Sequence, residues 1–136
     1  MVLNSVLFLL AGFDTTANTL SLIAHNLVIN PQVQKRLFEE ICGLEDGEII
    51  NYEQLSKLKY MDANINTLTE HYYPFGGGPR ICIGMRLAMM DIKMVLVNLL
   101  RSFELERCFE TLIKPNLTGQ GVLNSGKIFV KLNLRK

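Results

Sequence analysis

The stretch that most constrains this chain covers residues 74–84, where three consecutive glycines precede a cysteine and a long apolar helical pattern follows. Glycine has no Cβ, so backbone built from it can approach a large flat ligand closely. Cys82 stands where the loop turns into the helix, and the free amide groups and positive dipole end there favour its thiolate. Arg80 adds a permanent positive charge suited to a carboxylate. A thiolate in this setting is either a metal ligand or a nucleophile.

The residue spacing in this stretch decides between those two roles. Its fixed positions follow the pattern Phe-x-x-Gly-x-Arg-x-Cys-x-Gly from Phe75 to Gly84. The pattern resembles the haem-binding signature of the cytochrome P450 family. The resemblance implies that Cys82 ligates the iron of haem b (iron protoporphyrin IX) and that Arg80 pairs with a haem propionate. It also implies that Phe75 packs beside the thiolate while Gly78 and Gly84 permit the bend. The alternative is a buried cysteine in a flexible loop.

A second pattern lies within residues 2–29, whose apolar side chains cover most of the helical circumference. Ala11 and Thr15 are four residues apart and share a face of this predicted helix. Gly12 and Asp14 lie beside them, which makes a notch of small residues with a hydroxyl and a carboxylate. The notch resembles the I-helix signature of the same family. The resemblance implies that Thr15 relays a proton on the distal side of the haem, with Asp14 beside it. Threonine and aspartate that only hydrogen-bond to their own helix are the alternative.

The apolar start of the chain, residues 2–10, has the look of a signal or a membrane anchor. It lacks a basic flank, and Asp14 interrupts it well short of the ~20 residues that a membrane span needs. We therefore expect a buried core helix, and a chain that has no membrane anchor of its own.

Helical patterns account for most of the remaining chain. Asn30 and Pro31 mark one helix start, and Asn51 with Gln54 forms a capping pair at another. The predicted elements are helices over residues 2–29, 31–42, 52–58, 59–68 and 84–103, and a strand over residues 128–135.

These elements predict a mainly α fold with a small C-terminal β element. By resemblance it is a truncated cytochrome P450 fold with the I, J, start of the K, haem-binding loop and L helix. We expect a single incomplete domain over residues 1–136. Residues 1–70 would form the I-to-K helix region, and residues 71–136 the haem-binding loop, L helix and C-terminal strands.

The family pattern fails after Asn66. The K helix of the family carries Glu-x-x-Arg, but here no glutamate follows Asn66 and Thr69 stands where the arginine belongs. The only Glu-x-x-Arg runs from Glu104 to Arg107 in strand-like sequence, where residues three apart face opposite ways. Only a few residues join the predicted K helix to the haem loop, so the chain looks spliced, with an internal block deleted.

Composition narrows the classes of function. A net charge of +1 without a basic run argues against nucleic acid, and three widely spaced cysteines suit a reducing compartment. The resemblance implies a haem-thiolate monooxygenase that inserts one atom of O2 into an apolar small-molecule substrate. Its electrons would come from an NADPH-dependent P450 reductase, on the cytosolic face of the endoplasmic reticulum membrane for full-length relatives.

The segment from Phe103 to Pro115 loosely resembles the microsomal steroid- and drug-oxidising branch of the family. The alternative function is a non-catalytic product of such a gene, made by alternative splicing or by an incorrectly predicted gene. Much of the substrate pocket and the Glu-x-x-Arg brace are missing, so we expect this chain to be inactive on its own.

Overall fold

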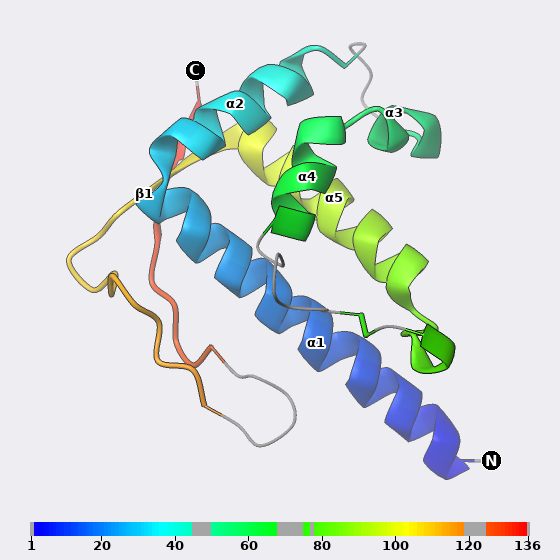
Figure 1. Ribbon diagram of the computed structural model, residues 1–136. Helices are drawn as coiled ribbons and strands as arrows, with labels where there is room; N and C mark the ends of the chain where they lie inside the picture. The colour runs from blue at the N-terminus through cyan, green and yellow to red at the C-terminus, as the bar shows by residue number, and fades with distance from the viewer. Residues whose placement is uncertain (1, 45–49, 68–74, 77, 119–124, 136) are drawn as a thin grey trace. The chain divides into compact units, whose positions relative to one another are not determined.

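The computed structural model describes residues 2–44, 50–67, 75–76, 78–118 and 125–135 (Figure 1). Its elements are α1 Val2–Ile29, α2 Pro31–Cys42, α3 Tyr52–Ser56, α4 Lys59–Thr67, the 3-10 helix η1 Gly78–Arg80, α5 Met85–Ser102, β1 Phe103–Glu106 and β2 Lys131–Leu134. The predicted mainly α class with a small C-terminal β element is confirmed. The predicted end of the fourth helix at Leu68 lies outside the described residues.

The chain divides into two compact units. One consists of Met1–Gln34 with Phe103–Lys136, and the other of Lys35–Ser102. The notch in α1 belongs to the first unit and the cysteine loop to the second.

The first unit contains a two-stranded antiparallel sheet in which Phe103 pairs with Leu134 and Leu105 with Leu132. β2 is shorter than the predicted strand over residues 128–135, and its apolar residues Leu132 and Leu134 are 48% and 73% exposed. Glu104 lies in β1, which confirms strand for the start of the single Glu-x-x-Arg.

The open edge of β1 is closed by a side chain instead of a third strand. The Leu105 amide donates to Gln34 Oε1 at 2.8 Å, and Gln34 Nε2 donates to the Leu105 carbonyl at 2.9 Å. A primary amide offers the same donor and acceptor as a peptide group, so it can take the place of a neighbouring strand. The buried apolar side chains of this unit are Ile23, Leu27, Val28 and Leu105.

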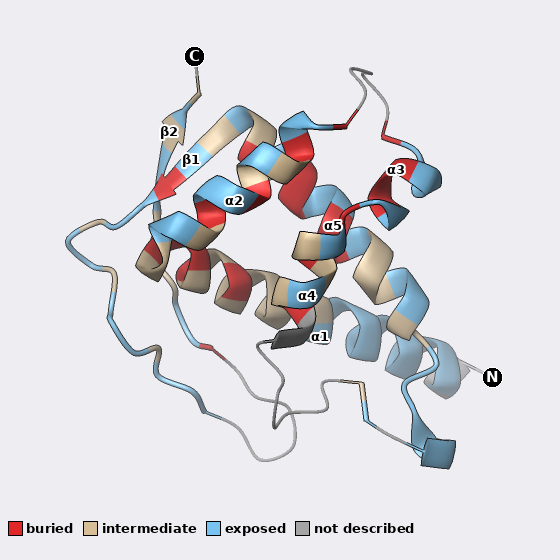
Figure 2. Ribbon diagram, turned by 45° about the horizontal axis from the view of Figure 1, so that its top comes forward, coloured by how far each residue is buried: buried red, intermediate tan, exposed pale blue. Residues whose placement is uncertain are grey.

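Burial changes along α1. Figure 2 shows buried residues in the C-terminal half of this helix and exposed residues in its N-terminal half. The expectation of a helix buried on all sides is therefore wrong for the first half. Among the hydrogen bonds of the described residues in this unit, the later chain reaches α1 only from Asn18 onward. Ser125 N donates to Asn18 Oδ1 at 3.4 Å, and His25 Nε2 bonds the Leu112 carbonyl at 2.7 Å.

The second unit has its own apolar core. Its fully buried side chains are Leu37, Ile41, Leu58, Met61, Ile92, Leu96, Val97 and Leu100. In α5 the buried residues Ile92, Leu96 and Leu100 recur every four residues and so form one stripe. Leu87 and Val95 are exposed, so the apolar pattern that covers this helix is buried along one side only.

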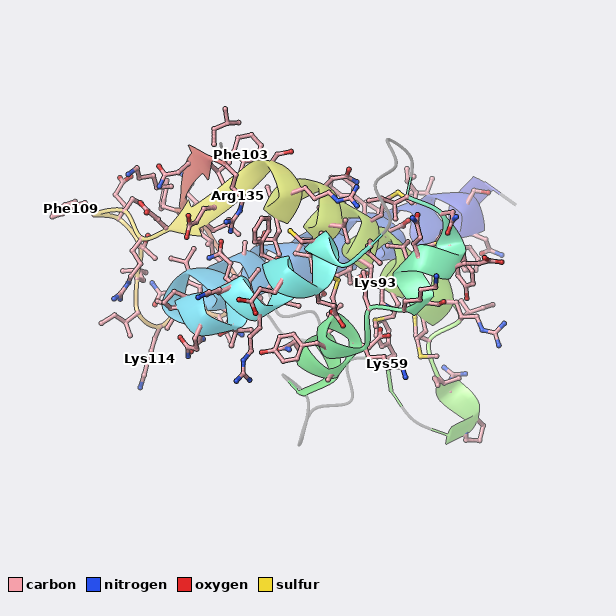
Figure 3. The ribbon with its side chains drawn as sticks, turned by 90° about the horizontal axis from the view of Figure 1, so that it is seen from above. Lys59, Lys93, Phe103, Phe109, Lys114 and Arg135 are labelled. Atoms are coloured by element: carbon pink, nitrogen blue, oxygen red, sulfur yellow. The ribbon has the colours of Figure 1, made fainter. Side chains whose placement is uncertain are left out.

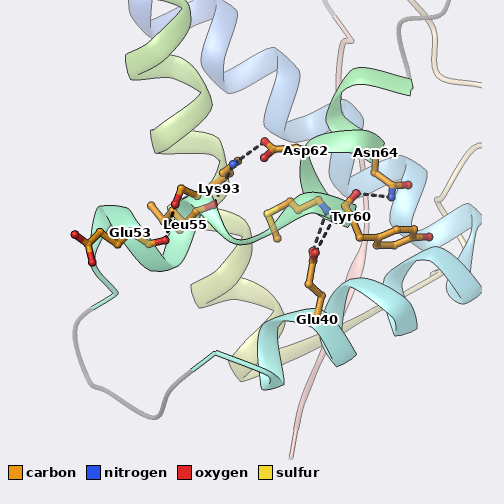
Figure 4. Close-up of polar contacts among 9 residues, drawn as sticks. Glu40, Glu53, Leu55, Tyr60, Asp62, Asn64 and Lys93 are labelled. Atoms are coloured by element: carbon orange, nitrogen blue, oxygen red, sulfur yellow. Dashed lines mark hydrogen bonds and ion pairs between the residues drawn. The ribbon is translucent and has the colours of Figure 1, made fainter.

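Two helix starts in this unit are capped by side chains. At α3 the predicted capping box is confirmed, since Gln54 N donates to Asn51 Oδ1 at 2.8 Å and Asn51 N donates to Gln54 Oε1 at 2.9 Å. At α4 the cap comes from α2, as Figure 4 shows. The Glu40 carboxylate accepts from Tyr60 N at 2.7 Å and from Met61 N at 2.9 Å. A carboxylate at this end also favours the helix dipole.

Candidate functional site

The cysteine loop is a tight turn closed by a backbone hydrogen bond. Cys82 N donates to the Phe75 carbonyl at 2.8 Å, so the two ends of the loop lie together. Between them Gly76 and Gly78 have φ of 69° and 68°. Residues other than glycine rarely adopt this left-handed backbone conformation, because their Cβ would lie too close to the following carbonyl oxygen. The loop therefore depends on its glycines for its shape.

The Cys82 side chain is exposed and forms no disulfide. It precedes α5, where Met85 N donates to the Cys82 carbonyl at 3.4 Å. A Cβ added at Gly84 would lie 3.9 Å from the Cys82 sulfur, at ordinary van der Waals contact, so Gly84 is next to the sulfur. Ile81 and Ile83 flank it and are 50% and 88% exposed. An accessible sulfur between two exposed apolar side chains fits a large, flat and mostly apolar macrocycle such as haem.

Two other predicted site residues, Arg80 and Phe75, belong to this turn. Arg80 ends η1 with its side chain exposed, and Phe75 is half-buried. Phe75 also borders an open groove of about 380 Å³ within the second unit. The groove is lined by Tyr52, Asp62, Phe75, Met85, Arg86 and Met89.

The notch in α1 leaves the helix unbroken. The Thr15 hydroxyl donates to the Ala11 carbonyl at 2.6 Å, so its hydrogen is used within the helix. Ala11, Gly12 and Asp14 are exposed, and a Cβ added at Gly12 would meet nothing within 4 Å. The notch is thus open on the side of Gly12. Because the notch and Cys82 belong to different units, their joint role stays a prediction.

The remaining cysteines have different surroundings. Cys42 is exposed at the end of α2, and Cys108 is partly buried with its sulfur 3.2 Å from Thr111 Oγ1. The hydrogen bond with the Thr111 hydroxyl lowers the pKa of the Cys108 thiol. Cys108 is therefore the cysteine to compare with Cys82 as a possible thiolate ligand. Unlike Cys82, it does not follow a glycine-rich turn.

Sequence reasoning missed a buried lysine that supports the helix after the loop. Lys93 Nζ donates to the Leu55 carbonyl at 3.1 Å and pairs with Asp62 Oδ1 at 2.6 Å (Figure 4). Lys93 thereby joins α5 to α3 and α4. The signal in the sequence is a lysine next to Ile92 on the apolar stripe of α5, a position that requires buried polar partners.

A mainly helical chain with an exposed cysteine in a glycine turn ahead of a long helix has the order of elements that the resemblance in sequence implies. The sequence profile of the Cytochrome P450 family matches residues 1–68 and, separately, residues 66–132. Together the two matches cover nearly the whole chain, and the chain belongs to the cytochrome P450 family.

Curated relatives agree with this assignment. The chain is 30% identical to Putative cytochrome P450 CYP13A7 of Caenorhabditis elegans, in an alignment that covers 94% of this chain and 38% of the relative. It is 30% identical to Cytochrome P450 3A6 of Oryctolagus cuniculus, covering 96% and 39%, and 28% identical to Cytochrome P450 3A9 of Rattus norvegicus, covering 93% and 38%. The relatives named 3A agree with the branch that the C-terminal segment resembles. The chain spans about two fifths of the length of these relatives.

The comparisons also locate the internal deletion. The two profile matches meet at residues 66–68, where the Glu-x-x-Arg pattern fails. The alignment with the C. elegans relative extends over 195 residues, more than the 136 of this chain, so the relative has residues that this chain lacks. The predicted internal deletion is confirmed.

Proposed function

We propose that this chain binds haem b through the Cys82 thiolate and carries part of the site of a cytochrome P450 monooxygenase. Such an enzyme inserts one atom of O2 into an apolar small-molecule substrate. The observation that supports this most is the accessible Cys82 sulfur on a turn that two left-handed glycines and the bond to Phe75 hold in place. Haem, when bound, supplies the oxygen chemistry, and the protein supplies the ligand and its surroundings.

The other residues have supporting roles in this proposal. Arg80 offers a cation to a haem propionate, and Phe75 packs beside the thiolate. Gly78 and Gly84 keep the turn narrow enough for close approach of the macrocycle. On the distal side Thr15 and Asp14, beside Ala11 and Gly12, would pass protons. Because the Thr15 hydroxyl is bonded to Ala11, it would have to exchange that bond for one to a ligand.

Haem binding is tested by reconstituting the chain with haem and recording the spectrum of the ferrous carbonyl complex. We expect Cys82→Ala to lose the spectral signature of thiolate ligation. Cys42→Ala and Cys108→Ala are the matched controls and should retain it, the latter despite the lowered pKa of the Cys108 thiol. An unchanged spectrum in Cys82→Ala, or its loss in Cys108→Ala, would contradict the assignment.

A second candidate function is a non-catalytic product of a P450 gene, and the internal deletion favours it. The block missing at residues 66–68 removes the Glu-x-x-Arg pattern, which in longer members stands ahead of the cysteine loop. We expect the reconstituted chain to bind haem weakly and to yield no oxidised product. The measurement is product formation with NADPH, an NADPH-dependent P450 reductase and an apolar substrate mixture, compared with a full-length relative. Sustained product formation that Cys82→Ala abolishes would show an active monooxygenase instead. For longer relatives, the proposed place of action is the cytosolic face of the endoplasmic reticulum membrane.

A further inference from the structure

Lys93 is a lysine on the buried stripe of α5, with 8% of its surface exposed. Its neighbours on that stripe, Ile92 and Leu96, are apolar. Figure 3 shows Lys93 among the helices of its unit, whereas Lys59 of α4 lies at the outside. A buried ion pair is often no more stabilising than well-packed apolar side chains of similar volume. Stability alone therefore does not account for a lysine at this position.

The side chain of Lys93 bonds two different elements at once. Its Nζ pairs with Asp62 Oδ1 of α4 at 2.6 Å and donates to the carbonyl of Leu55, in the last turn of α3, at 3.1 Å (Figure 4). A cation is favoured at that carbonyl, because the C-terminal end of a helix is the negative end of its dipole. Apolar packing has no preferred direction, whereas these two bonds do. Lys93 therefore fixes the rotation and the height of α5 against α3 and α4.

The face of α5 that carries Lys93 leads back to the cysteine turn. Arg86, in the first turn of α5, stands seven residues before Lys93 and so lies on the same face. Arg86 lines the groove of the second unit together with Asp62 and Phe75. The Phe75 carbonyl accepts from the Cys82 amide at 2.8 Å. The carboxylate that Lys93 holds thus borders the groove next to both ends of the turn, the start of α5 and Phe75.

We propose that Lys93 is a positioning residue of the cysteine turn: its bonds to Asp62 and Leu55 hold α5 where the turn stays closed and the Cys82 sulfur is directed toward its ligand. The identity of that ligand, haem iron, rests on the proposed function. The Glu-x-x-Arg pattern that stands ahead of the turn in longer members is missing here. In this chain the turn depends instead on the bonds of Lys93.

The first measurement needs no haem. Hydrogen exchange at the Cys82 amide reports whether the turn is closed, since that amide is bonded to the Phe75 carbonyl. Lys93→Met keeps the length of the side chain without its charge. We expect it to speed exchange at Cys82 at least about fivefold more than at Ile41, which is fully buried in α2 and reports unfolding of the whole unit. Lys59→Met, the same change at an exposed lysine, is the matched control and should leave both rates within about twofold of the parent.

Equal acceleration at Cys82 and Ile41 in Lys93→Met would show a role in stability alone, and the proposal would be wrong. Should circular dichroism show that Lys93→Met does not fold, Asp62→Asn replaces it, because asparagine keeps an acceptor for Lys93 but removes the charge that strengthens the bond. It should also speed exchange at Cys82 more than at Ile41. Parent rates at Cys82 in a folded variant of either kind would overturn the proposal.

The second measurement reconstitutes the full chain with haem and compares the spectra of the ferrous carbonyl complexes. We expect Lys93→Met to lower the share of thiolate ligation per bound haem in favour of neutral thiol ligation. Ile41→Val lowers stability by removing a buried methylene, changes none of the bonds of Lys93, and should keep the parent share. An unchanged share in Lys93→Met would contradict the role at the haem site. If the parent chain gave no thiolate signal while Lys93→Met still opened the turn, the haem ligation would be wrong and the positioning of the turn would stand.

Discussion

Gln34 is a polar residue with 2% of its surface exposed, and its amide completes the hydrogen bonding of β1. If the Nε2 donor is removed, the carbonyl of the buried residue Leu105 loses its hydrogen bond from this side chain. A glutamate has nearly the same shape, but its ionised form donates nothing and must lose its hydration. Replacing Gln34 by glutamate therefore tests the hydrogen bonding of this side chain while nearly keeping its shape.

We predict that Gln34→Glu lowers the free energy of unfolding by about 2–3 kcal/mol, since it leaves a buried carbonyl unpaired and buries a charge. The measurement is urea unfolding followed by circular dichroism. Gln32→Glu is the control, because Gln32 is exposed on the same helix and receives the same change of charge. Equal losses in the two variants would mean that charge on α2, rather than the bond to Leu105, is responsible.

At the scale of elements, α4 depends on a cap from another helix. The Glu40 carboxylate of α2 accepts hydrogen bonds from the amides of Tyr60 and Met61 in the first turn of α4. Among the hydrogen bonds described, no side chain at the start of α4 itself caps these amides. Asp62 of α4 pairs with Lys93 of α5. A displacement of α4 would therefore also disturb α5, the helix that follows the cysteine loop.

We predict that Glu40→Ala destabilises the chain by about 1–2 kcal/mol, the usual effect of losing an N-cap with its favourable charge. Glu39→Ala is the matched control, since Glu39 is the exposed neighbour and makes the same change of helix propensity in α2. The comparison is again made by urea unfolding. A similar loss in both variants would show that the cap contributes nothing.

For the whole molecule, sequence predicted the helices well because their signals are local. The proline of α2 and the capping box of α3 depend only on neighbouring residues, and the structure has both. The glycine-dependent turn before Cys82 could also be predicted from the sequence, since Gly76 and Gly78 have the positive φ that glycine adopts easily.

What sequence could not predict is which surfaces meet. Leu9 and Leu27 belong to one apolar helix, yet Leu9 is 72% and Leu27 3% exposed. The difference comes from distant chain packing on the second half of α1, and periodicity contains no information on it. For the same reason the pairing of Lys93 with Leu55 and Asp62 was missed, because those partners are far away in the sequence.

The division into two compact units leads to the last prediction. Each unit has its own buried residues, so each can open without the other if it behaves as a cooperative unit. Gln34→Glu weakens a bond inside the first unit, and Glu40→Ala weakens one inside the second. In native-state hydrogen exchange read by mass spectrometry, we expect the first variant to speed exchange in β1 and the second half of α1.

The second variant should speed exchange in α4 and α5, and each variant should leave the other unit within about twofold of the parent rates. Gln32→Glu and Glu39→Ala serve as controls that change neither unit. If either variant sped exchange equally in both units, the chain would be one cooperative body, because a bond lost in one place would then lower the opening free energy everywhere.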